Sequence, residues 1–262
     1  MLDLLVPSWS DAAGRHGFRP PDAAKGPSPA LRAQQMDGTP PAEQVPPAQP
    51  PQELLRAQQL GLGLGVQPLN EPLRAQQVHG VAVIEVSPGA QSPVGEADAL
   101  VSATVGLAVG IATADCVPIL LDAPGVVAAV HAGWRGSLEG VVLATLRHLA
   151  TRHGVAPAEV RVALGPSIDG CCFEIEREIA ARFAVRWGSR VWRLWRERPA
   201  GKGTLDLRGF NALVLLEAGV GENAIERVGP CTFCGPGPWA SYRREGPDCG
   251  RQLAWVAPGP RP

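Results

Sequence analysis

The sequence predicts a single α/β or α+β domain in which helices pack on a mostly buried β-sheet. From Val78 onward, short apolar runs interleave with segments whose apolar residues recur at helical spacing, and no long stretch is all strand or all helix. The 262 residues have a hydrophobic share of 45% and a mean hydropathy of +0.01, which is typical of a globular protein with a sizeable core.

Short apolar runs bounded by turn residues predict the strands. The first run is followed by Ser87-Pro-Gly, and the next three are bounded by Gly, Pro or Asp. Runs of this length suit strands that are buried on both faces of a sheet. The predicted strands cover residues 81–86, 105–111, 117–121, 126–131 and 160–164.

Three segments predict helices. Apolar residues between Leu138 and Leu149 recur at helical spacing, and Gly154 is expected to end that helix. Residues 176–185 have the pattern of a second helix. Asp206 can cap a third, which we expect to end at Gly219.

The first quarter of the chain differs from the rest. Residues 20–51 are rich in Pro, which fixes φ and removes a hydrogen-bond donor, so no regular element is expected there. We predict an irregular N-terminal segment over residues 1–75, partly packed on the core, and a packed domain over residues 76–262. Because Pro-rich backbone has few internal hydrogen bonds, residues 20–51 should be cleaved readily by protease.

Charge and composition exclude several classes of protein. Lys and Arg number 24 against 25 Asp and Glu, so the net charge of −1 gives no electrostatic case for a nucleic-acid or membrane-surface partner. No apolar run reaches the roughly 20 residues that span a bilayer, and the first residues lack the basic region of a signal peptide. Six Cys are therefore expected to be thiols or ligands of a cytoplasmic protein.

Three residues at predicted strand ends could form a catalytic metal site. They are His79, Cys116 and His131, and imidazole nitrogen and thiolate sulfur are preferred ligands of Zn²⁺. Three protein ligands leave a fourth position open for water or substrate.

Two alternatives use the same residues. The thiol and the imidazoles could be ordinary hydrogen-bonded core groups. Cys116 could also be a nucleophile with His131 or His79 as its base and Asp115 nearby. Because neighbouring strand residues point to opposite faces, Asp115 and Cys116 are not expected to share a pocket unless the strand has ended.

Arg135 follows Gly133-Trp134 at a predicted strand-to-helix junction. A guanidinium beside a helix N-terminus suits phosphate or carboxylate, and the alternative is a surface Arg stacked on Trp134. His148 and His153 are expected at the surface of the first helix. The segment Ser241-Tyr-Arg-Arg-Glu could line a polar pocket or be solvated.

The remaining cysteines give no clear site in the sequence. Cys171 and Cys172 are adjacent and are expected to face opposite ways. Cys231, Cys234 and Cys249 have no fourth Cys or His nearby in the chain, so we expect them to bind no metal and to form no disulfide.

An ordered set of motifs carries a family resemblance. They are Gln77-Val-His-Gly, Ala97-Asp-Ala, Thr113-Ala-Asp-Cys-Val-Pro-Ile, Ala129-Val-His-Ala-Gly-Trp-Arg-Gly, Gly165-Pro-Ser-Ile, Cys171-Cys-Phe-Glu, Leu205-Asp-Leu, Cys231-Thr and Ser241-Tyr-Arg-Arg-Glu. From about Gln76 to Val256 the chain resembles the YfiH-type laccase-domain family, also called the multicopper polyphenol oxidoreductase or purine nucleoside phosphorylase family.

The resemblance implies a single-domain α/β (α+β) sandwich with a mixed β-sheet core flanked by helices. It implies a metal, usually Zn²⁺, held by His79, Cys116 and His131. It also implies phosphorolysis of adenosine, inosine and methylthioadenosine, with adenosine deaminase activity, so that the partners are purine nucleosides and phosphate. The older laccase name implies Cu²⁺-dependent phenol oxidation. Five His cannot build several copper centres, so we rank nucleoside chemistry first.

The chain departs from the family near its start. The family has a Phe-Ser-Thr-Arg-x-Gly-Gly segment where this chain has His16-Gly-Phe-Arg-Pro-Pro. If that loop holds phosphate or substrate, activity is expected to be low or altered. Two further hypotheses are a metal-free hydrolase that uses Cys116 and His131, and a metal-holding partner protein without catalysis.

Overall fold

A six-stranded mixed sheet forms the centre of the structure, which is a computed structural model that describes residues 71–259. The strand order is β1-β2-β5-β4-β6-β10. The outer pairs β1·β2 and β6·β10 are parallel, and the inner pairs are antiparallel. The strands are β1 (Val83–Glu85), β2 (Ala99–Ser102), β4 (Val117–Ala123), β5 (Val126–Ala132), β6 (Arg161–Leu164) and β10 (Ile225–Arg227).

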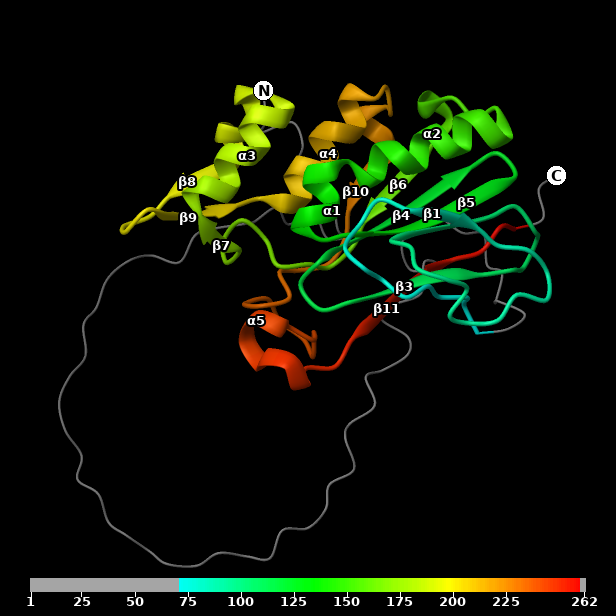
Figure 1. Ribbon diagram of the computed structural model, residues 1–262, viewed down its shortest axis with the longest axis horizontal. Helices are drawn as coiled ribbons and strands as arrows, with labels where there is room; N and C mark the ends of the chain where they lie inside the picture. The colour runs from blue at the N-terminus through cyan, green and yellow to red at the C-terminus, as the bar shows by residue number, and fades with distance from the viewer. Residues whose placement is uncertain (1–70, 260–262) are drawn as a thin grey trace, which may run out of the picture. The chain divides into compact units, whose positions relative to one another are not determined.

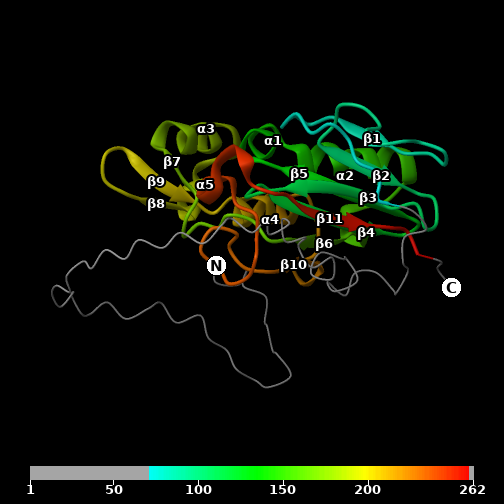
Figure 2. The ribbon, with the colours of Figure 1, turned by 90° about the horizontal axis from the view of Figure 1, so that it is seen from below.

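Helices cover one face of this sheet and a strand pair covers the other (Figures 1 and 2). The helices are α1 (Trp134–Glu139), α2 (Val141–His153) and α4 (Leu207–Glu217), with α3 (Arg177–Trp187) beside α1. The strand pair is antiparallel and joins β3 (Val109–Thr113) to β11 (Gln252–Val256). The predicted sandwich of a mixed sheet and flanking helices is therefore confirmed.

The central strand β5 contributes to two separate cores. Ala128 and Val130 pack in the core beneath the helices, whereas Val127 and Ala129 pack in the core beneath β3 and β11. Side chains alternate along a strand, so His131 continues the second set and points to the β3–β11 side. This alternation places an imidazole at the end of a fully buried strand.

A smaller antiparallel sheet was not predicted. It has the order β7-β9-β8, with β7 (Glu174–Glu176), β8 (Trp195–Glu197) and β9 (Lys202–Leu205). These strands have three or four residues and little apolar alternation, so their sequences carry a weak strand signal. The remaining short elements are α5 (Tyr242–Glu245) and the 3-10 turns η4 (Pro157–Glu159), η5 (Ser189–Leu194), η6 (Glu222–Ala224) and η7 (Gly246–Asp248).

The first predicted helix is two helices. Gly140 has a φ of 90°, in the left-handed region, and separates α1 from α2. The expected ends are confirmed elsewhere: Gly154 caps α2, and the Asp206 carboxylate accepts a hydrogen bond from the backbone N–H of Gly209 at 2.7 Å at the start of α4. The strand predicted from Val105 begins only at Val109, because Gly106 has a φ of 78° in a turn.

Most of the predicted N-terminal segment 1–75, including the Pro-rich residues 20–51, lies outside the described residues, as does His16. The part that is described pairs with the domain, since Leu73 is buried and bridges to Val109. Within residues 71–259, no helix is both long enough and apolar enough to cross a membrane.

Candidate metal centre and pocket

The orientation of His131 is set by Asp98, which precedes β2. The Asp98 Oδ1 lies 2.7 Å from Nδ1 of His131, and both side chains are almost fully buried. A carboxylate only accepts hydrogen bonds, so Nδ1 carries a proton and Nε2 is the ring nitrogen left to bind a metal. The second ring nitrogen of His131 is thereby available as a ligand.

The same carboxylate fixes the turn that presents His79. Asp98 accepts the backbone N–H groups of Val78, His79 and Gly80 at 3.2, 2.9 and 2.6 Å. These bonds hold His79 at a φ of 61°, a left-handed conformation that is uncommon for a non-Gly residue and is often found at functional sites. Asp98 thus positions both histidines.

Cys116 lies in the short connection between β3 and β4. Its neighbour Asp115 has a φ of 82°, and both residues line the same pocket. We expected them to share a pocket only if the strand had ended, and it has, because β3 ends at Thr113 and β4 begins at Val117. Each Asp115 oxygen is occupied: Thr232 Oγ1 donates at 2.7 Å and the backbone N–H of Arg243 at 2.7 Å.

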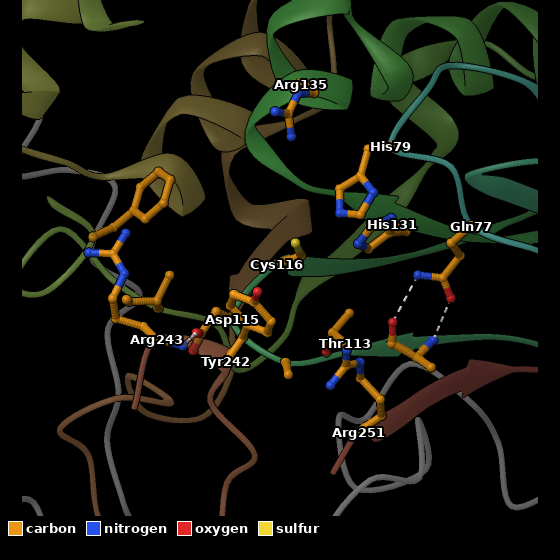
Figure 3. Close-up of a pocket in the computed structure, with 14 residues that line it drawn as sticks. Gln77, His79, Thr113, Asp115, Cys116, His131, Arg135, Tyr242, Arg243 and Arg251 are labelled. Carbon is orange, nitrogen blue, oxygen red and sulfur yellow. Dashed lines mark hydrogen bonds between the residues drawn. The ribbon is translucent and has the colours of Figure 1, made fainter. Parts of the chain in front are cut away.

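The structure brings His79, Cys116 and His131 together from three separate segments. Their ligand atoms all lie within 4.8 Å of one another (Figure 3). Ligand atoms around a tetrahedral Zn²⁺ are about 3.3 to 3.8 Å apart, which small side-chain rotations would reach from this spacing. The donor set of two imidazoles and one thiol therefore fits zinc with one open position.

A glycine makes the close approach of the three residues possible. A Cβ at Gly133 would lie 2.9 Å from Cδ2 of His79 and 3.1 Å from the sulfur of Cys116. Any larger residue there would push the imidazole and the thiol apart. This explains the Gly that directly follows β5.

Without a metal, Cys116 and His131 form a charged pair. Removal from water raises the pKa of the Cys116 thiol, but hydrogen bonding to His131 and His79 outweighs that effect and lowers its pKa to about 6. Burial lowers the pKa of His131, whereas hydrogen bonds with Asp98 and Cys116 raise its pKa to about 9. The thiolate is the form of Cys116 that binds a metal and that acts as a nucleophile, and a bound metal would displace the Nε2 proton of His131.

These residues form one wall of a pocket of about 640 Å³. In Figure 3, Arg135 lies above the two histidines and Cys116, and Tyr242 and Arg251 lie below them. The side-chain amide of Gln77 holds the pocket edge by exchanging two 2.8 Å hydrogen bonds with the backbone of Ala112. The full lining is Gln77, His79, Ala112, Thr113, Ala114, Asp115, Cys116, His131, Arg135, Ile168, Phe173, Tyr242, Arg243 and Arg251.

Arg135 lies at the pocket and also stacks on Trp134. It lines the pocket, and its guanidinium lies 4.5 Å from the centre of the Trp134 ring. Within the described part of the chain it makes no hydrogen bond or ion pair, so its donors are free for an anion. Arg243 and Arg251 also line the pocket, but they donate to the carbonyl of Glu174 and to the backbone of Cys249 and Gly250.

Sequence reasoning assigned no site role to Asp98, Gln77 or Arg251. Asp98 and Gln77 belong to the quoted motifs. Nothing in the local sequence around Asp98 indicates that its carboxylate contacts His131, which is 33 residues further along the chain. The segment with Tyr242 and Arg243 does line a polar pocket, which is one of the two outcomes considered for it.

His148 and His153 are not simple surface residues. They are half-buried, and their Nε2 atoms lie 3.1 and 3.3 Å from the carboxylate of Glu85 on β1. The surface expectation is wrong because α2 packs against β1. Both imidazoles therefore face the Glu85 carboxylate.

Four cysteines that do not line the pocket also gather in one place. The sulfur atoms of Cys171, Cys172, Cys231 and Cys234 all lie within 4.8 Å of one another. The expectation that Cys171 and Cys172 face opposite ways is wrong, because they occupy a turn rather than a strand. Cys231 and Cys234 were expected to lack further Cys or His ligands nearby. In the structure the other two thiols come from a segment about 60 residues earlier in the chain.

Comparisons with known proteins find a matching family model, similar sequences and similar solved structures. A family model described as multi-copper polyphenol oxidoreductase laccase matches residues 55–258. The purine nucleoside phosphorylase YlmD of Geobacillus stearothermophilus is 34% identical over 199 residues, which cover 72% of this chain and 73% of that protein. Its crystal structure superposes with a TM-score of 0.68 at 32% identity and covers 78% of this chain and 77% of its own.

Two further relatives bear on activity. A purine nucleoside phosphorylase of Deinococcus radiodurans is 39% identical over 186 residues, which cover 70% of this chain and 68% of that protein. A protein named adenosine deaminase RL5, from an unknown prokaryotic organism, is 35% identical over 161 residues, or 61% of each chain.

Proposed function

The chain belongs to the multi-copper polyphenol oxidoreductase laccase family, and on that premise we propose that it is a zinc-dependent purine nucleoside phosphorylase with adenosine deaminase activity. Relatives with these two names support the two reactions. The proposal rests on one observation: His79, Cys116 and His131 converge on one side of a pocket. The same pocket contains the guanidinium of Arg135, which has no hydrogen-bond acceptor in the described residues. The proposed substrates are adenosine, inosine and methylthioadenosine with phosphate.

The metal ligands in this proposal are His79, Cys116 and His131. A zinc ion held by these three residues would keep one position open, where a water or a substrate oxygen could be polarised. Asp98 keeps the Nε2 lone pair of His131 available and holds the His79 turn. Gly133 leaves the room that the imidazole of His79 and the thiol of Cys116 need.

The phosphate in this proposal is held by Arg135. Of the three arginines that line the pocket, only Arg135 has a guanidinium without a hydrogen-bond acceptor in the described residues. Stacking on Trp134 limits its motion, and a guanidinium binds phosphate oxygens in a bidentate manner. A phosphate near Arg135 would lie on the same side of the pocket as His79 and Cys116 (Figure 3).

The purine in this proposal contacts the aromatic side of the pocket. Tyr242 is 54% exposed and lines the pocket together with Phe173. Flat aromatic surfaces suit a purine ring. Asp115 already accepts two hydrogen bonds, from Thr232 and from Arg243, so its role is to hold the pocket wall.

The test uses purified full-length protein with adenosine, with and without phosphate. We expect adenine and a pentose phosphate only when phosphate is present, and inosine with ammonia in both cases. Cys116→Ala should abolish both activities and remove one zinc per chain, because two remaining ligands do not hold the metal. An active Cys116→Ala variant would contradict the proposal.

A metal-free hydrolase is the second candidate function. The thiolate–imidazolium pair of Cys116 and His131 favours it, because that pair is the arrangement of a cysteine nucleophile with its base. Chelator treatment separates the two candidates. Loss of activity that zinc restores supports the phosphorylase, and activity that survives complete zinc removal supports the hydrolase.

A further inference from the structure

The second group of four cysteines joins two loops that are distant in the sequence. Cys171 and Cys172 lie in the turn before β7, and Cys231 and Cys234 lie in the loop after β10. Their four sulfur atoms are within 4.8 Å of one another, and those of Cys171 and Cys234 are 3.6 Å apart. This group shares no residue with the set formed by His79, Cys116 and His131.

The spacing of the sulfurs is that of a metal site rather than of a disulfide. Four sulfurs at about 2.3 Å from a tetrahedral Zn²⁺ are about 3.8 Å from one another. The 3.6 Å between Cys171 and Cys234 is close to this value, whereas a disulfide requires about 2.05 Å. All six cysteines of the chain are free thiols in the structure.

The backbone around Cys231 is arranged for a tight two-cysteine turn. Cys231 and Cys234 have the C-x-x-C spacing that is common in zinc sites, and the next residue is Gly235. The backbone N–H of Gly235 donates to the Cys231 carbonyl at 2.8 Å, and a Cβ at Gly235 would lie 2.5 Å from that same oxygen. The backbone N–H of Asp169 points at the Cys231 sulfur at 3.4 Å, which suits a thiolate.

We propose that Cys171, Cys172, Cys231 and Cys234 bind a second, structural Zn²⁺. Four thiolates fill a tetrahedral shell and leave no position open, as in closed structural sites. Soft thiolate ligands select zinc over Ca²⁺ and Mg²⁺. The inference is independent of the proposed function, because it uses none of the residues of the catalytic centre.

A metal here would stabilise one wall of the catalytic pocket. Thr232, between the two ligands of the second loop, donates to Asp115 at 2.7 Å. Arg244 donates to the carbonyls of Thr232 and Phe233 at 2.7 and 3.0 Å. Through these bonds the four-cysteine site would fix the loop that holds Asp115, which in turn accepts the backbone N–H of Arg243.

The test is the metal content of full-length protein purified under reducing conditions, measured by elemental analysis. Cys234→Ser and Cys171→Ser should each contain one zinc fewer than the wild type. Because Cys171 and Cys234 are exposed, we expect both variants to fold. Cys249→Ser is the matched control, because this buried cysteine is outside the group, and it should keep the wild-type zinc content.

The two zinc sites can be distinguished by combining variants. Cys116→Ala should remove one zinc, Cys234→Ser the other, and the double variant both. If Cys116→Ala has no effect on zinc while Cys234→Ser removes one, the four-cysteine site stands and the proposed function fails.

Three results would overturn the four-cysteine site. They are unchanged zinc in both Cys171→Ser and Cys234→Ser, iron in place of zinc, or an intact mass about 2 Da below that of the reduced chain, which indicates a disulfide within the group.

Discussion

The Asp98 carboxylate and the His131 imidazole form a buried pair with 2.7 Å between Oδ1 and Nδ1. The same carboxylate accepts three backbone N–H groups from residues 78–80. Burial raises the pKa of Asp98, but the hydrogen bonds with His131 and with the Gly80 backbone outweigh it and lower the pKa below its ordinary value. One charged group therefore orients two of the three proposed zinc ligands.

Replacing Asp98 should weaken zinc binding without removing a ligand. Asp98→Asn loses the charge that holds the Nδ1 proton of His131 and places an amide N–H2 group near the backbone donors of the His79 turn. We expect the zinc Kd to rise about 10- to 100-fold, as for other partners of metal-bound His. Competition with a chromophoric chelator measures this. Glu96→Gln is the control, since Glu96 is exposed on the same segment, and an equal effect there would refute the role of Asp98.

Adding a methyl group at Gly133 should disturb the same centre sterically. Gly133→Ala places a Cβ 2.9 Å from His79 Cδ2 and 3.1 Å from Cys116 Sγ, so the two ligands must separate. We expect at least a tenfold loss of zinc affinity and of kcat. Gly221→Ala is the control, because its Cβ would meet no atom closer than 3.9 Å. Full zinc affinity in Gly133→Ala would show that the ligands do not need this close approach.

Removing the Arg135 guanidinium should act on phosphate. A charge-assisted contact contributes about 1.5–3 kcal/mol, so Arg135→Ala should raise the KM for phosphate about 10- to 100-fold. Zinc content should stay intact, and ammonia release from adenosine, which uses no phosphate, should fall less. Arg182→Ala is a matched control, because Arg182 lies 5.9 Å from the same Trp134 ring but does not line the pocket. Equal loss of base release and ammonia release would assign Arg135 to the nucleoside or to the fold.

The reactivity of Cys116 in zinc-free protein should depend on pH in an unusual range. The pKa of the thiol is lowered to about 6, so the thiolate predominates above that pH and is lost below it. Alkylation of Cys116 by iodoacetamide, followed by peptide mass spectrometry, should therefore have a midpoint near pH 6 and be constant by neutral pH. His131→Asn removes the main hydrogen bond to the thiol, and its midpoint should move toward that of an ordinary cysteine, above pH 8. A wild-type midpoint above pH 8 would contradict the charged pair.

Much of the fold could be predicted from local patterns. The apolar runs of β4, β5 and β6 are buried on both faces, as their composition indicates, and Asp206 and Gly154 cap the helices expected of them. The sheet β7-β9-β8 could not be predicted, because its strands are too short and too polar to show a period of two. The apolar residues keep helical spacing across Gly140, so their pattern predicts one helix. In the structure Gly140 has a φ of 90° and separates two helices.

The sequence by itself singled out His79, Cys116 and His131 as candidate zinc ligands and Arg135 as a candidate anion-binding residue. Only the tertiary structure decided which groups orient those ligands and that Cys171 and Cys172 meet Cys231 and Cys234. The physical reason is how far apart in the sequence the interacting residues are. Strand and helix periodicity is fixed by residues a few positions apart. The Asp98–His131 bond and the four-sulfur group instead join segments that are 33 and about 60 residues apart in the sequence, which only the sheet topology brings together.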